Sequence, residues 1–171
     1  MNFDNDTLID MPEIIVIAHN IRSAHNVGAF FRTCDGFGVS KLLLTGYTPY
    51  PTIQKDTRLP HFADKITRQI HKTALDAETF VPFEQMEAIP FDDLKAAGYT
   101  VVGLEQSERS VMLHDYTPPE KIALLLGEEV NGISADYLAQ CDDIIELPMQ
   151  GKKESFNVSV ATGIALYGLL Y

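Results

Sequence analysis

The sequence predicts a single α/β domain in which helices cover both faces of a mainly parallel sheet. The chain has 171 residues, of which 46% are hydrophobic and 22% charged, and common domains hold about 100 to 200 residues. Short apolar runs alternate with helical patterns, which is typical of a buried parallel sheet. The motifs G-x-G-x-x-G, G-x-x-x-x-G-K-[ST] and G-x-S-x-G do not occur. Dinucleotide-binding, P-loop and nucleophile-elbow enzymes are therefore not supported.

Apolar runs bounded by polar residues predict five buried strands, at 13–18, 41–46, 100–105, 121–127 and 143–148. Helices are predicted between them at 26–38, 61–74, 89–98 and 134–141, with Gly36 or Gly38 ending the first, and a last helix follows at 157–171. Asn26 is expected to be the N-cap of the first helix, and the two short helices are expected to be entered through Asp or Ser. The last helix is apolar on nearly every side, so we expect it to be buried within the domain or against a second subunit.

Residues 1–12 are predicted to form an acidic N-terminal tail, and residues 13–171 the folded domain. The tail lacks the basic start and apolar run of a signal peptide, and the chain has no apolar stretch near the ~18 residues of a membrane span. The two cysteines, Cys34 and Cys141, lie far apart without metal-ligand spacing. We expect a cytoplasmic protein with reduced thiols, no membrane association and no bound metal.

Three segments place glycines and polar residues at a strand exit or a helix entrance, where open α/β sheets bind ligands. They are NIRSAHNVGAFFRTCDGFGVSKLLL, LLLGEEVNGIS and IELPMQGKKESFNVSVA. Each segment alone has an ordinary explanation. Arg32 can be a surface arginine, Gly127 a turn glycine, and Ser155 or Asn157 the cap of the last helix.

In this order, the three segments resemble those of the SpoU (TrmH-like) class of RNA ribose 2'-O-methyltransferases of the SPOUT superfamily, over almost all of 13–171. The first matches Asn-x-Gly-x-x-x-Arg-Thr-x-x-x-Phe-Gly at 26–38, with His25 where many relatives carry Pro. The second matches Gly-x-Glu-x-x-Gly-Ile-Ser at 127–134. The third matches Ile-x-Ile-Pro-Met and Ser-Leu-Asn-Val-Ser-x-Ala at 145–161, with Phe156 in place of the usual Leu.

The resemblance implies a SPOUT α/β fold whose C-terminal third is threaded into a deep trefoil knot. It also implies that S-adenosylmethionine binds in the knot and that a homodimer completes the site. Backbone groups of the knot loops hold the adenosine part of the cofactor in this family, and the corresponding residues here are Leu104, Gly127, Leu147 and Phe156. Glycine permits close approach of a ring to the backbone, and the apolar side chains suit adenine.

For catalysis, the resemblance assigns the central role to Arg32, near Ser155 and Asn157. Because arginine is effectively always protonated, we favour a clamp on the neighbouring phosphate that also stabilises the developing alkoxide, with a role as base as the alternative. Ser155 and Asn157 are expected to orient the ribose. Glu129 either holds Asn157 or the loop in place, or is a structural acid of the turn. Asn26 is expected to cap its helix and to contact RNA.

The predicted function is S-adenosylmethionine-dependent methylation of a ribose 2'-hydroxyl in tRNA or rRNA. The alternative is a catalytically idle SPOUT-like dimer that binds RNA or another partner. Only about a dozen residues precede the first strand, so we expect the surface of the catalytic domain, or a partner, to select the RNA.

The net charge of −11 is unusual for a protein that binds RNA, because phosphate contacts usually require a basic surface. The charge is unevenly distributed, however. Residues 14–72 hold eight Lys or Arg against three Asp, a balance of +5, which leaves −16 for the rest of the chain. Lys65, Arg68 and Lys72 follow one another at helical spacing. Taken alone, this pattern is more typical of a solvated helix face. Together with the uneven distribution of charge, it predicts that RNA docks on the 14–72 surface.

Reversal of Lys65, Arg68 and Lys72 to Glu is therefore expected to reduce methyl transfer to RNA and to leave the affinity for S-adenosylmethionine unchanged. Transfer by the wild type is expected to fall steeply with salt, because phosphate contacts release counterions. Transfer assays and cofactor titrations of the triple variant check both expectations, and unchanged transfer would place the RNA elsewhere.

Overall fold

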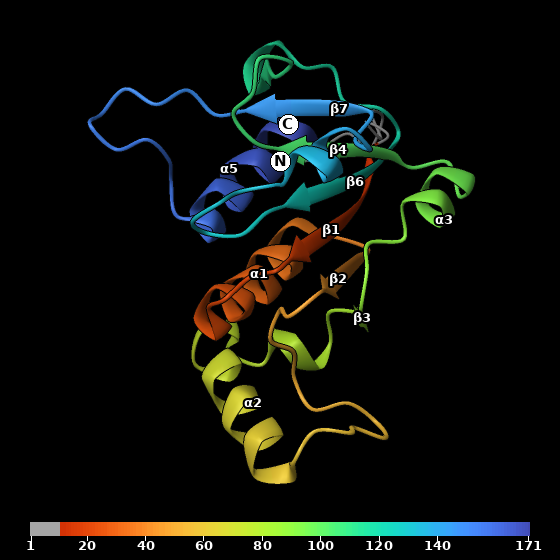
Figure 1. Cartoon of the computed structure of the whole chain (residues 1–171), viewed down its shortest axis with the longest axis vertical. Helices are drawn as coiled ribbons and strands as arrows, with labels where there is room; N and C mark the ends of the chain where they lie inside the picture. The colour runs from red at the N-terminus through yellow and green to blue at the C-terminus, as the bar shows by residue number, and fades with distance from the viewer. Residues whose placement is uncertain (1–10) are drawn as a thin grey trace, which may run out of the picture.

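The computed structural model describes residues 11–171, so most of the predicted 1–12 tail lies outside the described residues. Its centre is a seven-stranded sheet of order β3-β2-β1-β6-β4-β7-β5 (Figure 1). Every pairing between these strands is parallel. The strands are β1 Glu13–His19, β2 Lys41–Thr45, β3 Phe83–Met86, β4 Thr100–Leu104, β5 Val111–Met112, β6 Lys121–Leu126 and β7 Asp143–Glu146.

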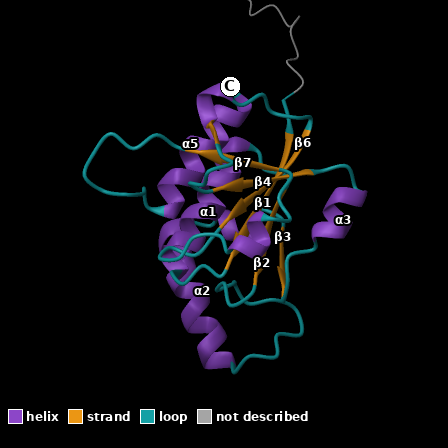
Figure 2. Ribbon diagram, turned by 45° about the horizontal axis from the view of Figure 1, so that its top comes forward, coloured by secondary structure: helices purple, strands orange, loops and turns teal. Residues whose placement is uncertain are grey.

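Helices lie on both faces of the sheet (Figure 2). They are α1 Ala24–Phe37, α2 Pro60–Ala74, α3 Phe91–Ala96, α4 Ala135–Leu138 and α5 Val158–Leu170, with short 3-10 helices η1 Ala77–Thr79 and η2 Leu113–Asp115. One apolar core packs beneath α1, α2 and α5, and a second beneath α3 and α4. The predicted α/β class with a parallel sheet is confirmed, and the trefoil knot stays a prediction.

The five predicted strands are correct to within two residues, and β3 and β5 were not predicted. Both lie at the edges of the sheet. Strand β3 has the sequence FEQM with no fully buried residue, and β5 has only two residues. An edge strand that buries little carries a weak apolar pattern, because periodicity reflects burial.

The expected N-cap of α1 was wrong. The cap is Ser23, whose side chain accepts the N–H of Asn26 at 3.3 Å, so Asn26 is the third residue of the helix. The predicted end is confirmed, since Gly38 closes the helix in the left-handed conformation at φ +65°. Entry through Ser is confirmed for α4 at Ser134, whereas α3 follows Pro90 without a side-chain cap.

Helix α5 is buried on one side only. Ala165, Leu166 and Leu169 pack into the core, while the opposite side exposes Val160, Ile164, Tyr167 and Tyr171. These four residues follow the i, i+4, i+7, i+11 spacing of a single helix face. The expectation that α5 is buried within the domain therefore holds for the side that faces the core, and the opposite side is exposed in the single chain. No helix within residues 11–171 is long and apolar enough to cross a membrane.

The order of the strands decides where a ligand can bind. Strand β1 lies between β2 and β6, and β6 separates it from β4. The chain thus runs outward from β1 through β2 and β3, and the later strands β4 to β7 all lie on the other side of β1. Such a switch point opens a crevice at the carboxyl ends of the strands. The loops that carry the second and third sequence motifs follow β6 and β7 at this edge.

Gly28 allows α1 and α2 to pack closely. A Cβ at this position would overlap Oγ1 of Thr73 and the carbonyl oxygen of Ile70, both on α2. At the same contact, Thr73 Oγ1 donates a hydrogen bond to the carbonyl of His25 at 2.8 Å. The motif glycine therefore has a packing role, because backbone atoms of α2 leave no room for a side chain.

Gly28→Ala is expected to lower the free energy of unfolding by about 1–3 kcal/mol, the usual cost of overpacking. Gly36→Ala is the matched control, since it lies on the same helix with nothing within 4 Å of its Cβ position. The control is expected to gain about 0.5–1 kcal/mol, because alanine favours helix over glycine. Urea denaturation of both variants checks the contrast, and equal effects would refute the close contact.

Candidate active site

A cavity of about 510 Å³ lies at the carboxyl edge of the sheet. It is bounded by the residues that follow β4, β6 and β7 and by the first turn of α5. All four residues assigned to cofactor binding line it, together with three others from the motifs. The set is Leu104, Gly127, Leu147 and Phe156, with Glu129, Ser155 and Asn157. The structure thus brings residues from three distant segments to one cavity.

The loop after β6 is shaped by two glycines. Gly127 lies against the backbone of Gly132 and Ile133, and a Cβ there would overlap both. The loop closes with paired backbone hydrogen bonds between Glu128 and Gly132, of 3.2 and 2.9 Å. Gly132 adopts a left-handed φ of +66°, which glycine tolerates without strain.

Glu129 lies against the N-terminus of α1. Its two carboxylate oxygens accept the backbone N–H groups of Arg22 at 3.0 Å and Ser23 at 3.1 Å. The amide of Asn26 donates a third hydrogen bond, also of 3.0 Å. A carboxylate suits this position, because the helix N-terminus carries unsatisfied N–H groups and the positive end of the helix dipole.

Asn26 connects this anchor to the start of α5. While its amide nitrogen donates to Glu129, its Oδ1 accepts a hydrogen bond of 3.3 Å from Asn157 Nδ2. Asn157 is the N-cap of α5 and accepts the backbone N–H of Ser159 at 2.9 Å. Glu129 therefore binds the start of α1 directly, which neither predicted role included, and it reaches Asn157 only through Asn26.

These contacts determine the charge state of Glu129. Burial alone would raise its pKa, but the hydrogen bonds from the backbone of Arg22 and from the Asn26 amide outweigh it and lower the pKa below the ordinary value. Glu129 is therefore ionised at neutral pH, and its negative charge stabilises the folded state.

The wall of the cavity is rich in acidic side chains, contributed by Glu105, Glu128, Glu129, Glu146 and Glu154. Glu105 accepts the N–H of Ile133 at 2.8 Å, and Glu146 accepts the hydroxyl of Ser110 at 2.8 Å. This wall disfavours phosphate and favours a ligand that carries positive charge, because like charges repel strongly where water is partly excluded. Sequence reasoning missed Glu105, although its place at the end of a predicted strand was a usable signal.

The cationic residues predicted for function lie outside the cavity wall. Arg32 is exposed on α1, and Lys65, Arg68 and Lys72 are exposed on α2. Within residues 11–171, none of the four forms an ion pair or a side-chain hydrogen bond. In the single chain, Arg32 makes no contact of this kind with Ser155 or Asn157, which the family resemblance places beside it.

Neither cysteine is suited to act as a nucleophile. Cys34 and Cys141 are free and buried, and burial raises the pKa of Cys34 to about 12 and that of Cys141 to about 11. Both are thus protonated thiols at neutral pH. Within the described range, no group of three or more His, Cys, Asp and Glu side chains is placed to hold a metal ion.

The family model of the SpoU rRNA Methylase family matches residues 13–167. The chain belongs to this family. It is 33% identical over 158 residues to the mouse tRNA (guanosine(18)-2'-O)-methyltransferase TARBP1. The aligned region covers 90% of this chain and 9% of that protein. It is also 33% identical over 157 residues to the tRNA (guanosine(18)-2'-O)-methyltransferase of Aquifex aeolicus, with 91% of this chain and 67% of that protein covered.

The fold is also that of solved SpoU-type structures. The crystal structure of an AdoMet-bound rRNA methyltransferase from Sinorhizobium meliloti matches with a TM-score of 0.74 at 23% identity, and the match covers 93% of this chain and 56% of that one. Residues of the second and third family motifs line the cavity. Asn26 of the first motif is hydrogen-bonded to Glu129 of the second and to Asn157 of the third.

Glu129→Gln is expected to lower the free energy of unfolding at pH 7 by about 1–3 kcal/mol, as is typical for loss of hydrogen bonds to a charged group. Since the folded-state pKa of Glu129 is lowered, the stabilisation is present above the unfolded pKa of about 4.3 and lost as pH falls below it. Between neutral pH and acid, the free energy of unfolding should therefore fall less for Glu129→Gln than for the wild type.

Glu108→Gln provides the matched control, because Glu108 is exposed and has no hydrogen bond or ion pair to the described residues. Its stability is expected to stay within about 0.5 kcal/mol of the wild type. Thermal unfolding across the acid range measures both variants, and identical pH profiles would contradict the anchoring role of Glu129.

Proposed function

We propose that this chain is an S-adenosylmethionine-dependent methyltransferase that acts on a ribose 2'-hydroxyl of tRNA or rRNA. The observation that carries the proposal is the single cavity lined by Leu104, Gly127, Leu147, Phe156 and the third-motif polar residues. The family match and the names of the relatives agree with this activity. A trefoil knot around the cavity, no metal and a cytoplasmic location belong to the same proposal.

The chemistry of the cavity fits S-adenosylmethionine. Its volume of about 510 Å³ lies within the roughly 300–1,000 Å³ of small-molecule sites. Leu104, Leu147 and Phe156 offer apolar surface for the adenine, and the acidic wall suits a ligand that carries a sulfonium and an ammonium group. When bound, this cofactor supplies an electrophilic methyl group.

The protein's own residues bind and orient the ribose in this proposal. Ser155 and Asn157 lie at the cavity and direct the 2'-hydroxyl inward, which lowers the barrier by positioning. Arg32 remains charged and binds the adjoining phosphate through its planar guanidinium. It stabilises the alkoxide that develops as the 2'-hydroxyl releases its proton to solvent water and takes up the methyl group. Its exposure without an ion pair among the described residues leaves it available for a phosphate.

A homodimer is part of the proposal. The exposed face of α5 presents Val160, Ile164, Tyr167 and Tyr171, with the two tyrosine rings 5.4 Å apart. Large apolar side chains at helical spacing on one face indicate an interface. A second copy of the chain on this face would bury it and would extend the wall near the start of α5, consistent with a site completed by two subunits.

The proposed activity is tested in two steps. Calorimetry with S-adenosylmethionine measures cofactor binding, and mapping of 2'-O-methylation in tRNA and rRNA with and without the protein identifies the product. We expect binding and at least one nucleotide whose methylation depends on the protein. Binding without transfer to any RNA would instead favour an idle RNA-binding dimer.

Substitutions of Arg32 test the phosphate clamp. Arg32→Ala and Arg32→Lys are both expected to lower kcat/KM strongly, because lysine keeps the charge but lacks the bidentate geometry. Cofactor affinity should stay unchanged in both, since Arg32 lies outside the cavity wall. Single-turnover transfer assays measure the effect, and a fully active Arg32→Lys variant would rule out the clamp.

A further inference from the structure

A second hollow, smaller than the cofactor cavity, lies between the loop after β2 and the first two turns of α2. It measures about 230 Å³, and its walls include Tyr47, Tyr50, Arg58, Phe62 and Ile66. Tyr47 is 57% and Phe62 49% exposed, so two aromatic rings face solvent beside a groove. We refer to this hollow as the aromatic groove.

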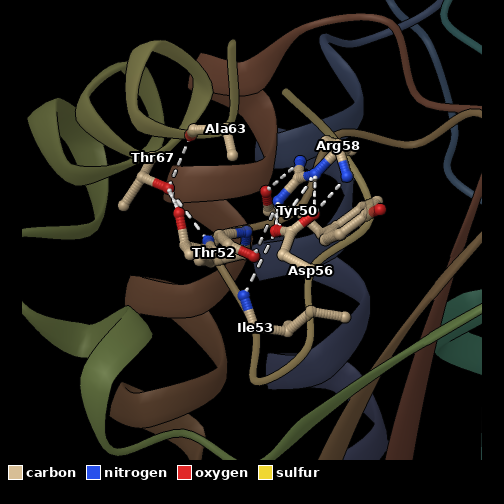
Figure 3. A network of polar contacts seen from close by, with 8 residues as sticks. Tyr50, Thr52, Ile53, Asp56, Arg58, Ala63 and Thr67 are labelled. Carbon is tan, nitrogen blue, oxygen red and sulfur yellow. Dashed lines mark hydrogen bonds and ion pairs between the residues drawn. The ribbon is translucent and has the colours of Figure 1, made fainter. Parts of the chain in front are cut away.

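The loop that forms the aromatic groove is held rigidly by Arg58 (Figure 3). The guanidinium of Arg58 donates to the carbonyls of Tyr50 at 2.9 Å and Pro51 at 3.2 Å, and it pairs with the carboxylate of Asp56 at 2.6 Å. Its central carbon lies 3.6 Å from the centre of the Tyr50 ring. This arrangement uses the planar shape of arginine as well as its charge.

The same loop is also fixed to α2. Thr67 Oγ1 accepts the backbone N–H of Thr52 at 2.9 Å, and the two threonine hydroxyls lie 2.9 Å apart. Figure 3 shows both contacts beside the Arg58 cluster. Since the loop is preorganised, a ligand in the aromatic groove binds without the entropic cost of ordering it.

The aromatic groove lies close to the cofactor cavity. Tyr47 follows β2 at the same edge of the sheet, where its N–H donates to Asn20 Oδ1 at 3.2 Å. Desolvation and the nearby Glu128 carboxylate raise the pKa of Tyr47, and Glu128 also belongs to the cavity wall. Because both hollows lie at the carboxyl edge of the sheet, an RNA strand that enters the cavity can place another of its bases in the groove.

The α2 side of the aromatic groove favours a polyanion. Lys65 follows Phe62 by three residues on α2, so the two side chains are neighbours on the helix. Arg68 and Lys72 continue this exposed row, without ion pairs to other residues of the 11–171 range. Aromatic rings flanked by unpaired cations are the combination that binds single-stranded nucleic acid, with stacking for the bases and charge for the backbone.

We propose that the aromatic groove binds an unpaired base of the RNA substrate, which stacks on Phe62 and Tyr47 while the cations of α2 contact its phosphates. The inference rests on the proposed function and extends it from the methylated ribose to a second nucleotide of the same RNA. Stacking of this kind tolerates any base, so the groove recognises an unpaired strand and excludes duplex RNA. Arg58 is a positioning residue, because most of its N–H groups are already occupied within the loop.

The chain contains no tryptophan, which permits a direct test by fluorescence. Phe62→Trp introduces one indole at the groove and preserves an aromatic surface. Its emission is expected to be quenched by an oligouridylate of about 12 nucleotides, within the ~4–16 nucleotides of single-strand sites. An abasic oligonucleotide of equal length and charge should leave the emission unchanged. Phe80→Trp, at a residue 59% exposed outside the groove, is the matched control.

Affinity measurements complete the test. Phe62→Ala and Tyr47→Ala are each expected to weaken oligouridylate binding roughly 5- to 150-fold, the range for loss of one stacked base. Tyr47→Phe and Phe80→Ala should bind as the wild type does. Quenching by the abasic oligonucleotide, or wild-type affinity of both alanine variants, would overturn the proposal, and the groove would then fit a protein partner better.

The outcome is separable from that of the proposed function. If the wild type binds S-adenosylmethionine and methylates RNA while the groove variants keep full RNA affinity, the groove inference alone fails. If the wild type neither binds the cofactor nor transfers methyl groups, the proposed function fails, whatever the fluorescence shows. Thermal unfolding of each variant verifies that the exposed substitutions leave the fold intact.

Discussion

The carboxylate of Glu129 holds the entrance of α1 against the loop after β6, and the geometry of the whole site depends on this contact. It accepts the N–H groups of Arg22 and Ser23, which directly precede α1, and it fixes the amide of Asn26. Through Asn26 the same anchor reaches Asn157 at the start of α5. One acid thus sets the relative positions of two helices, and with them the first and third motifs.

Charge is divided between two regions of the molecule in a way that the net value conceals. The cavity at the sheet edge is walled by five glutamates, whereas the exposed row on α2 carries Lys65, Arg68 and Lys72. In the proposed function, the acidic cavity disfavours phosphates and favours a cationic cofactor, and the basic row on α2 outside it attracts the RNA backbone. The net charge of −11 is therefore compatible with an RNA substrate that contacts a limited surface.

The sequence predicted the buried part of the fold well, because β1, β2, β4, β6 and β7 bury apolar runs and leave a clear pattern. The edge strands β3 and β5 bury little and were missed. The residues assigned to cofactor binding were found through the family resemblance, but Glu105 and the backbone partners of Glu129 were not. Its bonds to Arg22 and Ser23 join residues more than 100 positions apart, and no local pattern reports such a contact. The aromatic groove was missed for the same reason, since it forms only when the loop after β2 folds onto α2.

The proposed activity requires that the cavity at the carboxyl edge of the sheet binds S-adenosylmethionine. A crystal structure of the protein grown with S-adenosylhomocysteine shows where the cofactor product binds. We expect an ordered ligand in this cavity, with its purine against Leu104, Leu147 and Phe156. A ligand bound elsewhere on the chain, or none at saturating concentration, would contradict it.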